Sequence, residues 1–183
     1  MHSSLSFHPG FIWVIKIGSS ILTTDSGAPD PVIFESIAQD VAFLLSQKQR
    51  VVLISSGAIA CGMYHLGLPK KPAQIPQKQA IAATGQITLM NQYEKVFSAL
   101  GRKTAQILLT REDLSDRERY LNARHAIHQL LEWEILPIIN ENDTVAVEEI
   151  KFGDNDNLAA LVANVVEADL LVILTDQEGL YTA

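Results

Sequence analysis

Residues 135–166 read ILPIINENDTVAVEEIKFGDNDNLAALVANVV. The segment opens on a short apolar run typical of a buried strand, and it closes on apolar residues with helical spacing. Between these two elements lies a polar excursion with an Asn/Asp cluster at each end. The stretch therefore predicts a strand, a loop rich in hydrogen-bonding groups and a helix in succession, as in α/β proteins.

The same alternation extends over the rest of the chain. Short runs rich in valine and isoleucine predict buried strands at 11–17, 51–55, 104–109, 135–139 and 169–174. Helical spacing predicts helices at roughly 31–49, 57–66, 77–99, 117–133 and 155–167. This order predicts an α/β fold, a three-layer sandwich with a mostly parallel central sheet and right-handed crossovers. Asp30, Asp116 and Asp154 stand at expected helix starts, and residues 144–153 have the pattern of an inserted hairpin.

Composition limits the class of protein. The chain has 183 residues, of which 48% are hydrophobic, and this suits one domain with a real core over 11–183, preceded by a loose tail over 1–10. A net charge of −7 without a Lys/Arg run argues against nucleic acid or an anionic membrane as the main partner. One cysteine excludes an intramolecular disulfide, and no apolar run is long enough to span a bilayer. With no signal peptide visible, we expect a cytoplasmic protein.

The polar segment after the strand predicted at 135–139 carries both hydrogen-bond donors and hydrogen-bond acceptors. Carboxylates provide acceptors and side-chain amides provide donors, so the loop suits both the amine and the carboxylate of an amino acid. Asn, Asp and Gly are also the ordinary turn formers, and either cluster alone fits that interpretation equally well. Two clusters flanking one loop favour a site. The acids are Asp143, Asp154 and Asp156, and the amides are Asn140, Asn155 and Asn157.

Two strand ends carry small residues suited to an anion. In open α/β sheets ligands sit beyond the carboxyl ends of the strands. Lys16 lies just before a loop that contains Gly18 and Ser19, which makes it a candidate phosphate ligand; a lysine that snorkels to solvent is the alternative. The next strand ends in a loop with Ser56 and Gly57 that opens a helix, whose amides suit a negatively charged group.

Other candidates have weaker patterns. Thr175 and Asp176 follow the last strand and suit a ribose or a phosphate-bound cation, although they also suit a plain turn. His125 and His128 stand three apart on a predicted helix, but no third ligand is placed nearby, so we favour surface histidines and assign no metal site. Cys61 reads as a small buried hydrophobe without chemistry.

Five segments resemble the glutamate 5-kinases of the amino-acid kinase family: VIKIGSSILTT, LISSGAIACG, LLTREDLSDRERYLNAR, PIINENDTVAVEEIKFGDNDNLAALVA and LTDQEGLYTA. The match runs from about Trp13 to Ala183, and NEND, GDNDNL and LTDQEGLYTA in this order are its most specific part. The resemblance implies an amino-acid-kinase-like fold. It also implies ATP-dependent phosphorylation of the γ-carboxylate of L-glutamate to L-glutamyl 5-phosphate, the first step of proline biosynthesis, with Mg²⁺ required.

The family's motifs imply roles for individual residues. Lys16 matches the ATP-phosphate lysine, and Asp156 matches an aspartate that holds catalytic lysines in place. For Asp154, capping of the following helix is the alternative to a role in the site. Ser56, Asp143 and Asn155 match glutamate-binding positions. Residues that follow the same strand ends complete the expected site. Its catalytic residues are Lys16 and Asp156, and its substrate-binding residues are Ser56, Gly57, Asn140, Asp143 and Asn155. Its nucleotide-binding residues are Lys16, Gly18, Ser19, Thr175 and Asp176.

The chain departs from the family at its carboxyl end. Members continue into a glycine-rich loop with a second catalytic lysine, into further strands around the adenine, and often into a PUA domain, whereas this sequence stops at Ala183. A fragment and a natural short form both remain open. An uncovered sheet edge predicts association, and the resemblance implies a homo-oligomer sensitive to proline. Another amino-acid kinase, acting on acetylglutamate, aspartate, carbamate or a nucleotide, and a non-catalytic amino-acid-binding or assembly module are the alternative functions.

Overall fold

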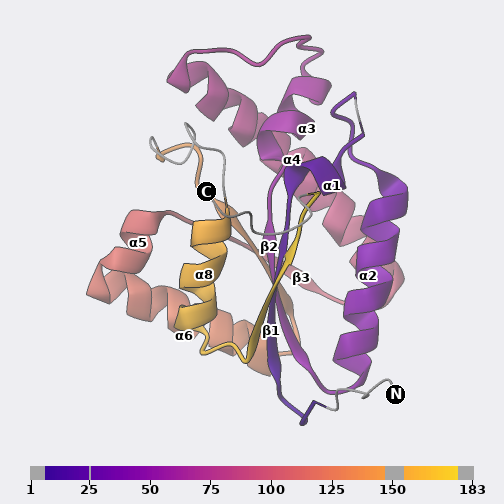
Figure 1. The fold of residues 1–183 in the computed structure, drawn as a ribbon, viewed down its shortest axis with the longest axis vertical. Coiled ribbons are helices and arrows are strands. Elements are labelled where there is room, and N and C mark those ends of the chain that lie inside the picture. The colour runs from indigo at the N-terminus through magenta and orange to yellow at the C-terminus, as the bar shows by residue number, and fades with distance from the viewer. Residues whose placement is uncertain (1–6, 25, 147–154, 177–183) are drawn as a thin grey trace, which may run out of the picture.

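The structure is a computed structural model of the 183 residues, which describes residues 7–24, 26–146 and 155–176. Its described strands form one sheet in the order β3-β4-β2-β1-β5, and every neighbouring pair is parallel (Figure 1). The predicted parallel sheet is therefore confirmed. The strands are β1 (Ile12–Ile17), β2 (Arg50–Ser55), β3 (Thr104–Leu109), β4 (Leu136–Glu141) and β5 (Leu170–Leu174).

Helices cover both faces of the sheet (Figure 1). The described helices are α1 (Ser19–Leu22), α2 (Pro31–Ser46), α3 (Ala58–His65), α4 (Ile75–Ala99), α5 (Arg111–Ser115), α6 (Arg117–Glu132) and α8 (Asp156–Val165). Leu53 and Ile138 pack with α2, α3 and α4 on one face, whereas Val52 and Ile139 pack with α5, α6 and α8 on the other. This alternation gives the predicted three layers. Within the described ranges no helix is both long and apolar enough to cross a membrane.

The two outer strands differ from the sequence-based expectation. β1, β2 and β4 are buried along almost their whole length, as predicted. β3 and β5 are half-exposed, with Leu108 37% and Ile173 40% exposed. The prediction that they are buried strands is wrong because each is the last described strand at its edge of the sheet, so a strand neighbour covers it on one side alone.

Helix starts follow the predicted capping chemistry in part. The carboxylates of Asp30 and Asp116 accept hydrogen bonds from the backbone N–H groups of Val32 and Arg119, both at 3.0 Å. Asp154 and the greater part of the predicted hairpin at 144–153 lie outside the described residues. The sequence interpretation missed the short helices α1 and α5; Thr110 caps the latter in a reciprocal capping box.

Residues 7–10 are held against the body of the protein. The Gly10 N–H donates to the Lys48 carbonyl at 2.8 Å, and the Phe7 ring lies 4.7 Å from the rings of both Phe11 and Trp13. The prediction of a loose tail is wrong for these residues because aromatic packing and backbone pairing hold them. Residues 1–6 lie outside the described part.

Candidate active site

The carboxyl ends of four strands bring most of the predicted residues to one end of the sheet. Ile17 pairs with Ser55 on one side and with Leu174 on the other, and β2 pairs with β4 up to Ile54 and Ile139. Across this end of the sheet the order is therefore the β4 end, the Ser55 loop, the β1 end and the β5 end. The predicted amino-acid-binding residues Asn140, Ser56 and Gly57 follow β4 and β2 on one side of Lys16, and Thr175 and Asp176 follow β5 on the other.

Lys16 lies in the middle of this end of the sheet. The residue is 7% exposed, and its Nζ lies 2.6 Å from Oδ1 of Asp156, in the first turn of α8. A buried ammonium needs a partner of opposite charge, and the Asp156 carboxylate provides one. The alternative of a lysine that snorkels to solvent is therefore wrong, and Lys16 is held at a defined position by the residue that the family resemblance pairs with it.

Glycine at position 18 keeps the space beside the lysine open. Its N–H donates to the Leu174 carbonyl at 3.0 Å, which joins the β1 end to the β5 end. A Cβ at this position would lie 3.3 Å from that carbonyl oxygen and 3.9 Å from Lys16 Nζ. Ser19 is exposed and begins α1 directly after it. A side chain at position 18 would therefore lie between the Leu174 carbonyl and the lysine ammonium, where glycine leaves room for a ligand.

The loop after β2 has a backbone conformation that requires glycine. Gly57 has φ of +98°, in the left-handed region, and it precedes the first residue of α3 without any described side chain capping that helix. The Ser56 carbonyl accepts a hydrogen bond from the Ser55 hydroxyl at 3.1 Å, and the same hydroxyl lies 3.0 Å from the Tyr93 hydroxyl. Tyr93 of α4 thus holds the loop in place through Ser55, and the first backbone N–H groups of α3 are left for other acceptors.

Two glycines let α3 and α4 touch backbone to backbone. A Cβ at Gly85 would lie 1.8 Å from the Ala58 carbonyl oxygen and 2.3 Å from the Gly62 nitrogen. A Cβ at Gly62 would in turn lie 2.0 Å from the Ile81 carbonyl oxygen. This contact fixes the start of α3, and with it the Ser56 loop, against α4. Sequence reasoning gave these glycines no role.

A chain of side-chain amides crosses the site. The Asn155 Nδ2 group donates to the Ser55 carbonyl at 2.6 Å and to Asn140 Oδ1 at 2.9 Å. Asn140 Nδ2 donates in turn to Gln86 Oε1 at 2.8 Å. Sequence reasoning missed Gln86, although a signal exists: it is a polar residue on the buried face of α4, between Ala82 and Leu89.

Asp143 lies in the loop after β4, beside the amide chain. It lines a hollow of about 220 Å³, together with Gln86, Glu141, Asn142 and Thr144 among other residues. Gln79 of α4 anchors the end of the loop, because its Nε2 donates to the Ala146 carbonyl at 3.2 Å. Asp143 therefore lies on the same side of Lys16 as Asn140 and Asn155.

Thr175 and Asp176 follow β5, next to the β1 end. Both are exposed, and the Thr175 hydroxyl donates to Asp176 Oδ1 at 3.5 Å. Their place on the far side of Lys16 from Asp143 agrees with separate substrate and nucleotide positions.

The remaining candidates are two histidines of α6 and the buried Cys61. Within the described residues, no group of three His, Cys, Asp or Glu side chains is placed to hold a metal ion, and His125 is exposed on α6. Burial, followed by repulsion from Arg124, lowers the pKa of His128 below its usual 6.5. Burial raises the pKa of the Cys61 thiol to about 11, so the thiol stays protonated at neutral pH and is a poor nucleophile.

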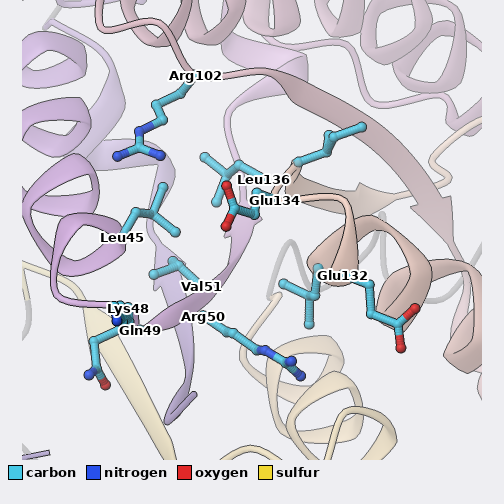
Figure 2. Close-up of a pocket in the computed structure, with 11 residues that line it drawn as sticks. Leu45, Lys48, Gln49, Arg50, Val51, Arg102, Glu132, Glu134 and Leu136 are labelled. Atoms are coloured by element: carbon cyan, nitrogen blue, oxygen red, sulfur yellow. The ribbon is translucent and has the colours of Figure 1, made fainter. Parts of the chain in front are cut away.

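A second hollow lies at the opposite end of the sheet. It has a volume of about 330 Å³, and it is lined by Leu45, Lys48, Gln49, Arg50, Val51, Arg102, Leu131, Glu132, Glu134, Ile135 and Leu136 (Figure 2). Helices α2, α4 and α6 end around it, and the carbonyl ends of helices carry partial negative charge. Both basic and acidic side chains line it, and it lies at the amino ends of β2 and β4, away from Lys16.

Comparisons with known proteins agree with this geometry. Residues 11–183 match the Amino acid kinase family. Curated relatives include the Glutamate 5-kinase of Pelobacter propionicus, 58% identical over 170 residues, which are 93% of this chain and 46% of the relative. The Glutamate 5-kinase of Caldanaerobacter subterraneus is 55% identical over 168 residues, 92% of this chain and 45% of the relative. The chain thus spans about half the length of the curated relatives it matches. By the match over 11–183 and by its parallel α/β sandwich, this chain belongs to the amino acid kinase family.

Proposed function

We propose that this chain forms the substrate-binding and phosphate-binding part of an enzyme that phosphorylates the γ-carboxylate of L-glutamate with ATP. The product would be L-glutamyl 5-phosphate, in the first step of proline biosynthesis. The observation that carries the proposal is the ion pair of the buried Lys16 with the half-exposed Asp156, at the carboxyl ends of the strands. Relatives that carry the name Glutamate 5-kinase at 58% and 55% identity support it.

The substrate side is proposed to bind glutamate through a mixed set of charged and polar groups. The Asp143 carboxylate would pair with the substrate ammonium, and the backbone N–H groups around Gly57 would donate hydrogen bonds to a substrate carboxylate. No general base is required, since the γ-carboxylate is already ionised at neutral pH. The residues assigned to this side are Ser56, Gly57, Asn140, Asp143 and Asn155.

The nucleotide side is proposed to bind the phosphates of ATP. Phosphoryl transfer to a carboxylate needs in-line positioning and cations that spread the developing charge. Lys16, which Asp156 holds in place at 2.6 Å, would provide one such cation at the point where the two sides meet. The residues assigned to this side are Lys16, Gly18, Ser19, Thr175 and Asp176.

Mg²⁺ fits this arrangement as an ion carried by ATP. Magnesium usually takes one or two carboxylates together with substrate phosphates and water. Asp176 provides an exposed carboxylate at the β5 end, and the described residues hold no preformed group of three acidic or histidine ligands. The ion would neutralise part of the phosphate charge during transfer.

A second candidate is a module of the same fold that binds an amino acid or mediates assembly without catalysis. Assembly into a homo-oligomer, inhibition by proline and a cytoplasmic location are proposals of the same standing, taken from the family resemblance.

Glutamate-dependent ADP formation by the purified chain with Mg-ATP tests the proposal. Hydroxylamine would trap the acyl phosphate as a hydroxamate, and acetylglutamate, aspartate and carbamate would serve as competing substrates. We expect hydroxamate with glutamate and little with the others. Preference for another acceptor would overturn the assignment of glutamate. Saturable glutamate binding by folded protein without ADP formation would instead support the non-catalytic module.

A further inference from the structure

The amide chain at the site has a fixed direction. Asn140 Oδ1 accepts a hydrogen bond from the backbone N–H of Glu141 at 2.9 Å, so this atom must be the oxygen. At the other end, the Asn155 atom that lies 2.6 Å from the Ser55 carbonyl must be the nitrogen, because a carbonyl oxygen only accepts. These two backbone groups settle which amide atoms are oxygen and which are nitrogen, an assignment that is otherwise ambiguous.

This direction determines what Asn155 offers to a ligand. Its Nδ2 group donates both hydrogens, one to the Ser55 carbonyl and one to Asn140 Oδ1. Its Oδ1 accepts no hydrogen bond from the residues that the structure describes. The expectation from the sequence was that Asn155 offers an amide donor. In the structure it has an acceptor left, which suits an ammonium and does not suit a carboxylate.

Gln86 closes the chain at its far end. Because Asn140 Nδ2 points at it from 2.8 Å, the facing atom of Gln86 is Oε1. Gln86 is 9% exposed, and its Nε2 is buried without a hydrogen-bond partner among the described residues. Rotating the Gln86 amide by half a turn would place two N–H groups against each other, so the unpaired donor is retained as the lesser penalty.

We propose that Gln86 is a positioning residue which, through Asn140, holds the Asn155 side-chain oxygen toward the α-ammonium of the substrate. Gln86 itself touches no reacting group. This inference rests on the proposed function for the identity of the substrate, whereas the direction of the amide chain stands on the hydrogen bonds alone. Sequence reasoning could not reach it, because it depends on contacts between α4, β4 and the start of α8.

The substitution Gln86→Met tests the inference, because methionine has a similar length and lacks the acceptor oxygen. Gln86→Glu retains an acceptor oxygen whether or not its carboxyl is protonated. Gln92→Met is the matched control, the same change at a half-buried position of the same helix. Binding of L-glutamate and of glutarate, which lacks the α-ammonium, is measured by calorimetry for each variant of the 183-residue chain.

We expect Gln86→Met to weaken glutamate binding about tenfold to a hundredfold, as for a lost hydrogen bond to a charged group, and to leave glutarate within about twofold. Gln86→Glu and Gln92→Met should keep the wild-type ratio of the two affinities. An unchanged ratio in Gln86→Met, or equal weakening of both ligands, would overturn the positioning role and indicate only a structural one.

A second measurement keeps the two proposals separate. If wild-type protein binds no glutamate, the proposed function fails, and exchange of the Asn155 side-chain amide hydrogens in ligand-free protein still tests the amide chain. We expect slow exchange of both hydrogens in the wild type and faster exchange in Gln86→Met. Fast exchange in the wild type, or no difference between the two proteins, would contradict the inference.

Discussion

The contact between α3 and α4 gives a sharp test through Gly85→Ala. In an open helix interior this change stabilises a protein by about 1 kcal/mol, because alanine is the better helix former. Here the added Cβ would lie 1.8 Å from the Ala58 carbonyl oxygen and 2.3 Å from the Gly62 nitrogen. Non-bonded carbon and oxygen atoms rest near 3.3 Å, so the start of α3 must move by roughly 1.5 Å.

The movement has a cost in stability and in binding. Overpacking of a core usually costs about 1–3 kcal/mol, and backbone atoms yield less than side chains, so we expect a loss of about 3 kcal/mol. For a chain of this length that lowers the unfolding midpoint by about 10 °C. Because α3 begins directly after Gly57, glutamate affinity should fall as well.

Thermal unfolding and glutamate titration of Gly85→Ala, with Thr84→Ala as the control, measure both effects. Thr84 is half-exposed on the same helix, and its hydroxyl donates only within α4, to the Ala80 carbonyl at 2.9 Å. A Gly85→Ala protein as stable as the wild type, with unchanged glutamate affinity, would refute the claim that the backbone contact positions the Ser56 loop.

Three further predictions follow from the site and its surroundings. Asp143→Ala should raise the KM for glutamate far more than the KM for ATP, and equal changes would remove the role given to Asp143. Cys61, with its pKa raised to about 11, should react with iodoacetamide only when the protein unfolds, and rapid labelling of folded protein would contradict its burial. The folded-state pKa of His128 lies below 6.5, so the unfolded chain binds the proton first, and stability should fall as the pH drops below about 6.5 until the folded-state pKa is reached. His128→Gln should reduce this fall in a series of unfolding curves from pH 7.5 to 5.5, and an unchanged pH dependence would show that His128 does not contribute.

Local sequence patterns were enough to predict most of the fold. Buried strands such as β2 and β4 are continuous apolar runs, so their positions could be predicted to within about two residues. The exposure of β3 and β5 could not, because a strand's place in the sheet depends on how distant segments pair. The aromatic contacts of Phe7 were missed for the same reason.

The sequence points to members of the candidate site where chemistry marks a single residue. Lys16 stands out as a charge inside an apolar run, and the Asn/Asp clusters mark the loop after β4. Gln86 and Gly85 lie in an ordinary helical sequence, and their roles depend on what the opposite backbone presents to them. The donor or acceptor role of Asn155 likewise depends on the Ser55 carbonyl, a hundred residues away along the chain.

The central proposal is that Lys16, held by Asp156, would stabilise the phosphoryl group during its transfer to glutamate. The most direct measurement is kcat for glutamate-dependent ADP formation by Lys16→Ala, beside the wild type and Lys103→Ala, a change at an exposed lysine before β3. We predict that Lys16→Ala lowers kcat by about 10²-fold or more, while the protein stays folded and Lys103→Ala retains wild-type activity. A folded Lys16→Ala protein with near-normal kcat would contradict the account.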